Sequence, residues 1–282
     1  TQAEVDNFIV QYPACTVITG NVTIESSPQH FQQNMITNLD GLRNITSIEG
    51  NLRIGSYRPE PNTIQFSAIN NLNGLSNLTS VGGDLIIKQD IGLVNIDGLS
   101  SLTFVGGDMD IFSIDALTTI DGFSALTAIG GDIRIRQNPA LTKIDGFAAL
   151  TTIGGDIRID QNQALMDIDG FAALTTIGGG IRLNENQALT NIDEFAALTT
   201  IGGDIWIYRT ALTKIDGFAT LTTIGGDFTI SQNQTLTNID GFAALTSIGR
   251  GLYFISNPVL GNINGFTALT TIGGFLDFSQ SQ

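Results

Sequence analysis

The sequence predicts an all-β repeat protein, a β-solenoid of about eleven coils with a helical cap at its N-terminal end. Three observations lead to this fold class. One phrase of about 24 residues recurs along the chain, as in LTKIDGFAALTTIGGDIRIDQN over residues 141–162. Within it, Ile157 and Ile159 alternate with polar residues, which is the pattern of a half-buried strand. Each copy also has a turn at a corner between its strands, in most coils a Gly-Gly pair.

The first residues predict a helical cap over 1–14. Thr1 and Glu4 have the spacing of a capping box, in which each side chain bonds the backbone of the other residue. Pro13 is expected to end the helix. We expect the cap to cover the open end of the first coil, and residues 15–282 to form a single solenoid domain. The apolar face of the helix would consist of Val5, Phe8 and Ile9.

Coils of two kinds make up the predicted solenoid. From Asp84 onward, the residues that follow the corner are 24 apart, except for one step of 23, whereas the first two steps are 30 and 33. Residues 21–83 are therefore longer, irregular coils, and residues 84–282 are regular ones. Loops that interrupt a regular scaffold often carry function, and they can equally be packed ornaments. The insertions in the first coils bear His30, Phe31, Tyr57, Arg58 and the segment 59–61.

Apolar columns are expected to run through the inside of the stack, because equivalent positions of successive coils lie about 4.8 Å apart. In the unit at 141–162 the inward residues are Leu141, Ile144, Phe147, Leu150 and Ile153. The aromatic column would consist of Phe123, Phe147, Phe171, Phe195, Phe218, Phe242 and Phe266, with Leu42, Leu75 and Leu99 in earlier coils. The corner glycines, such as Gly154 and Gly155, are expected to permit a positive φ at a corner where a side chain would clash.

Two polar columns accompany the apolar ones. A buried amide ladder is expected to satisfy backbone groups of adjacent coils, and its members are Asn138, Asn162, Asn186, Asn233 and Asn257. A column of Asp residues opens a short turn, where Asp would act as an N-cap. Its members are Asp40, Asp97, Asp121, Asp145, Asp169, Asp193, Asp216 and Asp240. A calcium column is the alternative, but the glycine-rich nonapeptide calcium motif is absent, and no metal site is predicted.

A third column consists of Thr and raises the alternative of an ice-binding face. Its members are Thr46, Thr79, Thr103, Thr127, Thr151, Thr175, Thr199, Thr222, Thr246 and Thr270. Ice-binding solenoids usually present two outward Thr on one strand in a Thr-x-Thr pattern. Here the paired residues are adjacent, as in Thr151 and Thr152, so both cannot point outward from one flat strand. A hydroxyl ladder on β-branched residues is therefore the preferred interpretation.

Composition excludes several classes of function. The formal charge of −15, with few Lys and Arg, argues against nucleic acid and anionic membranes as partners. No apolar run approaches the roughly 20 residues that cross a bilayer, so membrane insertion is not expected. The chain has one Cys, Cys15, and one His, His30, which leaves no ordinary catalytic triad or zinc finger. Because nearly every Asp belongs to a repeated column, we predict neither an enzyme nor a cofactor.

Three stretches resemble the receptor L domain: YPACTVITGNVTI at 12–24, GLRNITSIEGNLRI at 41–54 and GLSNLTSVGGDLII at 74–87. This is the leucine-rich-repeat-like, right-handed solenoid of the insulin and epidermal growth factor receptor ectodomains, and similar modules occur in fungal wall and bacterial surface proteins. The resemblance implies a right-handed, non-enzymatic solenoid that is extracellular or at the cell surface, and we expect a mature form without its signal peptide. The chain is longer and more regular than the family and lacks its disulfide framework, so no ligand-binding residues carry over.

The outward positions of the regular strands predict a basic and aromatic face on an acidic protein. Arg, Trp and Tyr are favoured anchors of interfaces. We therefore expect this face to take a glycan, an acidic polymer or a neighbouring subunit. The alternative is a solvated face on which Asp132 and Asp156 pair with arginines across strands. The candidate binding residues are Arg134, Arg136, Arg158, Arg182, Trp206, Tyr208 and Tyr253.

The last coil is expected to leave a broad apolar end with unpaired backbone, formed by Leu269, Ile272, Leu276 and Phe278. Repeat proteins normally cover such an end, because an open edge pairs with other chains. The first functional expectation is therefore a structural surface protein whose subunits self-associate, end to end into a fibre. The second is a monomeric adhesion or recognition module that uses the Arg/Trp/Tyr face, and ice binding is a distant third.

The chain contains N-glycosylation motifs, which are used only if the organism that produces the protein glycosylates it. Asn21, Asn44 and Asn77 each begin an N-x-Thr motif and are candidate glycosylation sites. Asn233 begins another, but it belongs to the presumed buried ladder and is not expected to be modified.

Overall fold

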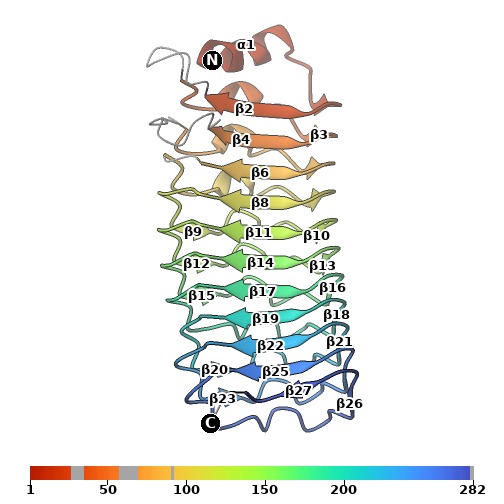
Figure 1. The fold of residues 1–282 in the computed structure, drawn as a ribbon. Coiled ribbons are helices and arrows are strands. Elements are labelled where there is room, and N and C mark those ends of the chain that lie inside the picture. Colours follow the sequence, from red (N-terminus) through yellow and green to blue (C-terminus); the bar gives the residue numbers. More distant parts are fainter. Residues whose placement is uncertain (27–34, 57–68, 90–91, 280–282) are drawn as a thin grey trace.

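The computed structural model describes residues 1–26, 35–56, 69–89 and 92–279 of the chain. They form a parallel β-solenoid with one helix at its N-terminal end, which confirms the predicted fold class (Figure 1). The insertion residues His30, Phe31, Tyr57, Arg58 and 59–61 lie outside the described residues.

The N-terminal helix α1 (Gln2–Gln11) has the predicted capping box. The backbone N–H of Glu4 donates to the Thr1 hydroxyl, and the N-terminal ammonium group donates to the Glu4 carboxylate. Val5 and Phe8 pack against the core, and the helix contacts the short helix η1 (Asp40–Leu42). It therefore covers the first coil, and Figure 1 shows it at the end of the stack next to β2. Cys15 is half-buried and also packs against the core, as expected of a structural thiol.

Two parallel sheets, each of eleven strands, run along the described part of the chain. Sheet A consists of two-residue strands: β1 (Val17–Ile18), β3 (Ser47–Ile48), β5 (Ser80–Val81), β7 (Phe104–Val105), β10 (Ala128–Ile129), β13 (Thr152–Ile153), β16 (Thr176–Ile177), β18 (Thr200–Ile201), β21 (Thr223–Ile224), β24 (Ser247–Ile248) and β26 (Thr271–Ile272). Sheet B consists of β2 (Val22–Ser26), β4 (Leu52–Ser56), β6 (Leu85–Lys88), β8 (Met109–Phe112), β11 (Ile133–Arg136), β14 (Ile157–Asp160), β17 (Ile181–Asn184), β19 (Ile205–Tyr208), β22 (Phe228–Ser231), β25 (Leu252–Ile255) and β27 (Leu276–Asp277).

The remaining side of each coil has less regular structure. In the early coils it contains the short helices η1, η2 (Asn73–Leu75) and η3 (Asp97–Leu99). Later coils contain two small sheets there. One is formed by β9 (Thr119–Ile120), β12 (Lys143–Ile144) and β15 (Asp167–Ile168), and the other by β20 (Lys214–Ile215) and β23 (Asn238–Ile239).

The core is the stack of inward side chains, as predicted. Leu141, Ile144, Phe147 and Leu150 have no exposed surface. The rings of the aromatic column, from Phe123 to Phe266, stack with centroids 5.1–5.4 Å apart and planes inclined by 4–15°. This spacing lies within the range of favourable aromatic pairs, so each ring both fills the core and orders its neighbours.

The amide ladder is also confirmed. Asn138 and Asn162 have no exposed surface. The Asn162 Oδ1 atom accepts the backbone N–H of Asn138 at 3.0 Å, and its Nδ2 donates to the carbonyl of Ile135 at 2.9 Å. The residue before each of these Asn has a left-handed backbone, with φ of 56° at Gln137 and 59° at Gln161. This uncommon conformation turns the chain out of sheet B and directs the amide inward.

The corner glycines are required by the expected clash of a side chain, but the expected positive φ is wrong. Among the described residues, Gly55 is the one glycine in the left-handed region of φ. A Cβ atom on Gly154 would instead overlap the carbonyl oxygen of Gly130, and one on Gly155 would overlap the Asp132 carboxylate. Glycine is therefore required because successive coils approach too closely for any side chain.

The corner carries a carboxylate ladder whose role was not predicted. The Oδ1 atom of Asp108 accepts the backbone N–H of Asp132 at 2.8 Å, and Oδ1 of Asp132 accepts that of Asp156 at the same distance. Each carboxylate thus satisfies a backbone donor of the next coil, which leaves its second oxygen free for other partners.

The Asp column of the short turn does not cap it as expected. The N-cap position of η1 is Leu39, and no side chain caps it. Asp40 is the first residue of the helix, and its own N–H donates to Oδ1 of Asn38 at 3.1 Å. Asp therefore stands one position too late to cap the turn. Lys143 relieves part of the charge in this column, with Nζ 3.3 Å from Asp145 and 3.0 Å from Asp169.

The Thr column is a hydroxyl ladder, as preferred, but the argument from adjacent residues is wrong. Thr151 and Thr152 are both exposed. Strand β13 starts at Thr152 and has two residues, so the alternation rule of a flat strand does not reach Thr151. The Thr151 hydroxyl donates to the Thr127 carbonyl at 3.1 Å, so it joins successive coils.

Candidate functional site

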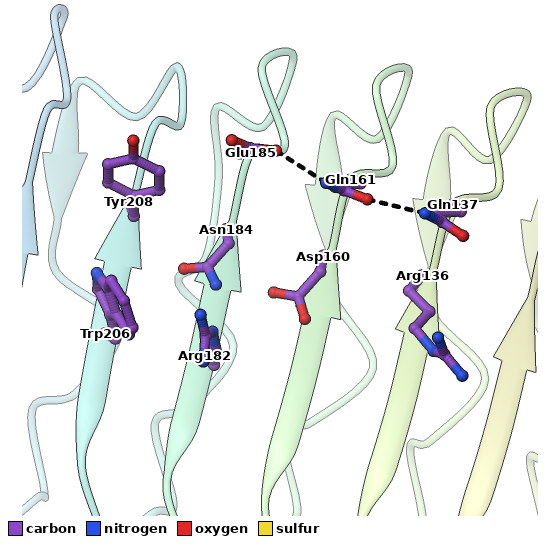
Figure 2. Close-up of a pocket in the computed structure, with 9 residues that line it drawn as sticks. All are labelled: Arg136, Gln137, Asp160, Gln161, Arg182, Asn184, Glu185, Trp206 and Tyr208. Atoms are coloured by element: carbon purple, nitrogen blue, oxygen red, sulfur yellow. Dashed lines mark hydrogen bonds between the residues drawn. The ribbon is translucent and has the colours of Figure 1, made fainter.

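The outer face of sheet B consists of rows of side chains that run across the strands. One row joins Arg136, Asp160, Asn184 and Tyr208 on β11, β14, β17 and β19. Alternation along the strands places a second row beside it, which includes Arg158, Arg182 and Trp206. The turn residues that follow the strands, among them Gln137, Gln161 and Glu185, border the first row (Figure 2).

A groove of about 320 Å³ lies on this face. Its volume is at the lower end of the range of small-molecule sites, which is about 300–1,000 Å³. Figure 2 shows its lining residues, which are Arg136, Gln137, Asp160, Gln161, Arg182, Asn184, Glu185, Trp206 and Tyr208.

Two of the predicted binding arginines are paired with the carboxylate ladder at the corner. Arg134 contacts Asp108 and Asp132, with N–O distances of 2.5 Å in both pairs. Arg158 contacts Asp156 at 2.5 Å and Asp132 at 3.4 Å. The solvated face with Asp–Arg pairs is therefore the arrangement at these two positions, and neither arginine lines the groove.

The pairing pattern is broken at Arg182. The residue two positions before it is Gly180, where the preceding coils have Asp132 and Asp156. Without that carboxylate, the guanidinium stacks over Trp206, 4.2 Å from the ring centroid. Within the described residues the guanidinium of Arg182 makes no hydrogen bond or ion pair, so its donors are available to a ligand.

Two buried oxygen atoms in the groove lack hydrogen-bond partners. They are Oδ1 of Asp160 and Oδ1 of Asn184. Asn184 is only 8% exposed. Burial raises the pKa of the Asp160 carboxyl, and the charges of Arg182, Arg158 and Arg136 oppose that rise. Such unpaired acceptors are costly in a folded protein, because water no longer solvates them fully.

The rim of the groove is held by side-chain hydrogen bonds. Gln137 donates to Gln161 and Gln161 donates to Glu185, both at 3.0 Å (Figure 2). Arg209 also donates to Glu185 at 3.4 Å and lies over the Tyr208 ring, 4.9 Å from its centroid. The rim is thus ordered across several coils without any ligand.

The structure brings together only part of the predicted binding face. Arg136, Arg182, Trp206 and Tyr208 line the groove. Arg136 is itself paired with Asp110 at 2.9 Å. Tyr253 lies outside it, and its ring folds over the corner at Gly251. The lining residues that sequence reasoning missed are Gln137, Asp160, Gln161, Asn184 and Glu185. Gly180, where the corner column lacks its Asp, is a sequence signal that could have marked this part of the face.

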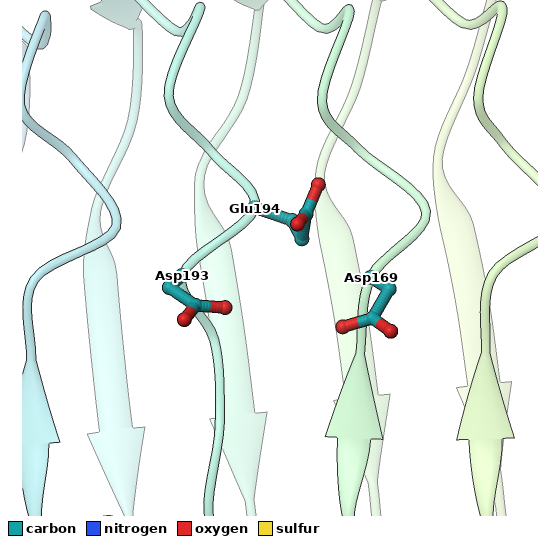
Figure 3. Close-up of side chains that lie close together, drawn as sticks. All are labelled: Asp169, Asp193 and Glu194. Atoms are coloured by element: carbon teal, nitrogen blue, oxygen red, sulfur yellow. The ribbon is translucent and has the colours of Figure 1, made fainter.

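An acidic cluster on another side of the solenoid could hold a cation. Ligand oxygens of Asp169, Asp193 and Glu194 lie within 4.8 Å of one another (Figure 3). In the same region, burial and the neighbouring Asp169 raise the pKa of Asp167 to about 6. All three residues of the cluster are exposed or half-buried, and acidic groups of that kind occur widely without an ion. The cluster therefore does not establish a metal site.

The sequons differ in how their amides are used. The Nδ2 atom of Asn44 donates to the carbonyl of Pro13 at 3.0 Å, and that of Asn77 donates to Arg43 at 2.7 Å. Asn233 has no exposed surface, in line with its expected place in the ladder. Asn21 and Asn77 are both exposed, and Oδ1 of Asn21 accepts the backbone N–H of Asn51 at 2.8 Å.

The predicted apolar end is exposed in its last strand. Leu276 is 55% exposed and Phe278 44% exposed, and the preceding Phe275 is 79% exposed. Leu269 and Ile272 are half-buried and pack against the core instead.

A family comparison agrees with this architecture. Residues 175–266 match the sequence model of the Receptor L domain. Together with the parallel solenoid, this match shows a receptor L domain-like, leucine-rich-repeat-like fold, as the resemblance implied. No curated protein matches the chain. The described residues include no helix with the length and apolar character needed to span a bilayer.

Proposed function

We propose that this receptor L domain-like solenoid is a non-enzymatic, extracellular recognition module, and that its ligand binds in the groove on sheet B. The observation that carries this proposal is the local break in the repeat. Arg182 has lost the carboxylate that pairs with its counterparts, and it lies beside buried acceptors without partners. In the two preceding coils, the arginines at this position, Arg134 and Arg158, are paired with carboxylates within the protein.

The chemistry of the groove favours binding over catalysis. Glu185 is bonded to Gln161 and Arg209, and the described residues that line the groove include no Ser, Thr, Cys, His or Lys that could serve as a nucleophile or exchange a proton with Asp160. An exposed Trp and a Tyr beside a few polar groups are the composition of a recognition site.

Binding to arrays of glycans and of purified surface proteins would test this function. We expect a ligand whose affinity falls at least tenfold in Trp206→Ala. Tyr253→Ala is the matched control, because it removes an aromatic residue from the same sheet face outside the groove. Equal loss in both variants, or a ligand unaffected by Trp206→Ala, would contradict the proposed site.

The second candidate function is self-association through the apolar end. It is supported by the exposure of Phe275, Leu276 and Phe278 beside the outermost strands β26 and β27. Light scattering over a concentration series, together with electron microscopy, would measure it. The expected result is a particle that grows with concentration and is reduced to a monomer by Leu276→Lys. A constant mass in the unmodified protein would remove this candidate.

A further inference from the structure

The charges around the groove narrow the class of ligand. Arg136 is neutralised by Asp110 at 2.9 Å, and Glu185 by Arg209. This leaves one positive group, Arg182, and one negative group, Asp160, side by side on adjacent strands. A cation in the groove would be repelled by Arg182, and an anion would be repelled by the buried carboxylate of Asp160. The groove is therefore best matched by an uncharged ligand.

The hydrogen-bonding groups require a ligand that both donates and accepts. Oδ1 of Asp160 and Oδ1 of Asn184 are buried acceptors that need donors. The guanidinium of Arg182 needs acceptors. Hydroxyl groups do both, since each has one donor hydrogen and two acceptor lone pairs. Asp160 and Asn184 are register partners on neighbouring strands, whose backbones are about 4.8 Å apart, and their side chains project side by side from the same face, so hydroxyls on adjacent carbon atoms can reach both.

The aromatic groups supply the remaining surface. Trp206 is 37% exposed, and its ring centroid is 6.2 Å from that of Tyr208. Arg182 covers part of the indole, as Figure 2 shows, and the exposed part offers apolar carbon to the C–H groups of a sugar ring. The groove volume of about 320 Å³ lies at the lower end of the range for small-molecule sites, so a ligand of about one sugar ring is expected.

We propose that the groove binds one uncharged sugar unit of a glycan. Neighbouring hydroxyls of that unit donate to Asp160 and Asn184 and accept from Arg182, and the C–H face of the ring packs against Trp206. The inference rests on the proposed recognition function and names the ligand class of the same site. It also explains why the repeat is broken here, since Gly180 releases Arg182 for the ligand.

Isothermal titration with neutral oligosaccharides, uronic-acid oligosaccharides, free amino acids and calcium would test the ligand class. We expect binding of at least one neutral oligosaccharide and none of calcium. Asn184→Ala and Arg182→Ala should each weaken that binding at least tenfold, and Tyr253→Ala should leave it unchanged. Circular dichroism and thermal melts of each variant would separate lost binding from lost folding.

A charge substitution gives a sharper test than loss of affinity. Asp160→Asn keeps an acceptor at this position and removes its charge, so Arg182 is left unopposed. We expect this variant to fold and to gain affinity for uronic-acid oligosaccharides relative to neutral ones. An unchanged preference would overturn the assigned role of Asp160.

The outcomes distinguish the inference from the function on which it rests. If the protein binds only acidic glycans, or binds amino acids, the assignment of a neutral sugar as the ligand is wrong. A protein ligand that depends on Trp206, with no glycan bound, would do the same and would keep the recognition function. If no ligand of any class depends on Trp206 or Arg182, both fail.

Discussion

Replacing Asn162 by Ala is expected to lower the free energy of unfolding by about 2–6 kcal/mol. The side chain has no exposed surface. It accepts the N–H of Asn138 at 3.0 Å and donates to the carbonyl of Ile135 at 2.9 Å. The side chain also accepts from Nδ2 of Asn138 at 3.2 Å and donates to the carbonyl of Asp160 at 3.2 Å. Counting only the two shorter bonds, the substitution takes a partner from one buried donor and one buried acceptor, and each loss costs about 1–3 kcal/mol. Alanine cannot restore either bond, and the closed stack leaves no path for bulk water.

Equilibrium urea unfolding, followed by circular dichroism, measures the loss, and amide hydrogen exchange at Asn138 locates it. Gln163→Ala is the control, because Gln163 is exposed and donates one surface hydrogen bond, to Glu185 at 3.0 Å. We expect that control to change stability by about 0.5 kcal/mol or less. A loss below about 1 kcal/mol in Asn162→Ala, with unchanged exchange at Asn138, would refute the ladder argument.

Three further substitutions test other parts of the stack. Gly154→Ala should lower the thermal unfolding midpoint strongly, because the new Cβ overlaps the carbonyl of Gly130. Gly261→Ala is the control and should be nearly neutral, because nothing lies within 4 Å of a Cβ at that position. Equal midpoints of the two variants would contradict the close-contact argument. Phe171→Ala should cost about 3–5 kcal/mol in urea unfolding and Phe171→Leu much less, as Leu already fills this column in early coils. Burial and a neighbouring carboxylate raise the pKa of Asp167 to about 6, so its contribution to stability is full below pH 4 and is lost as pH rises through 6. Asp167→Asn should remove that part of the pH dependence, and at pH 7.5 it should unfold at a higher urea concentration than the unmodified protein. If the urea midpoints of the two proteins change in parallel between pH 4 and 8, the assigned effect of Asp167 is wrong.

Most of the fold could be predicted because every coil repeats the same environment. Ile157, Phe147 and Asn162 each recur at their positions often enough to mark an inward strand, an aromatic column and a ladder. The corner glycines show the limit of that reasoning. A positive φ and a close approach both exclude a Cβ atom, so the sequence pattern of Gly154 does not distinguish them.

The groove was less predictable, because it depends on departures from the repeat. Periodicity marked Arg134, Arg158 and Arg182 as equivalent, yet two of them are paired with carboxylates and one is not. The difference arises from a neighbouring residue on the same coil, Gly180. Burial of the Asn184 oxygen likewise depends on side chains from adjacent coils, which a single-coil pattern does not contain.

Because the regular coils are nearly identical, their number can change during evolution without disturbing the packing between them. In the described part of the regular region, successive strands of both sheets pair in the same parallel register from coil to coil. Unequal recombination that duplicates or deletes one 24-residue unit within this region would therefore conserve the packing. Each such event would change the molecule by about 4.8 Å in length. Gain or loss of coils can therefore change the distance between the groove and either end of the solenoid in steps of one coil, and each new contact between coils would be of the existing kind.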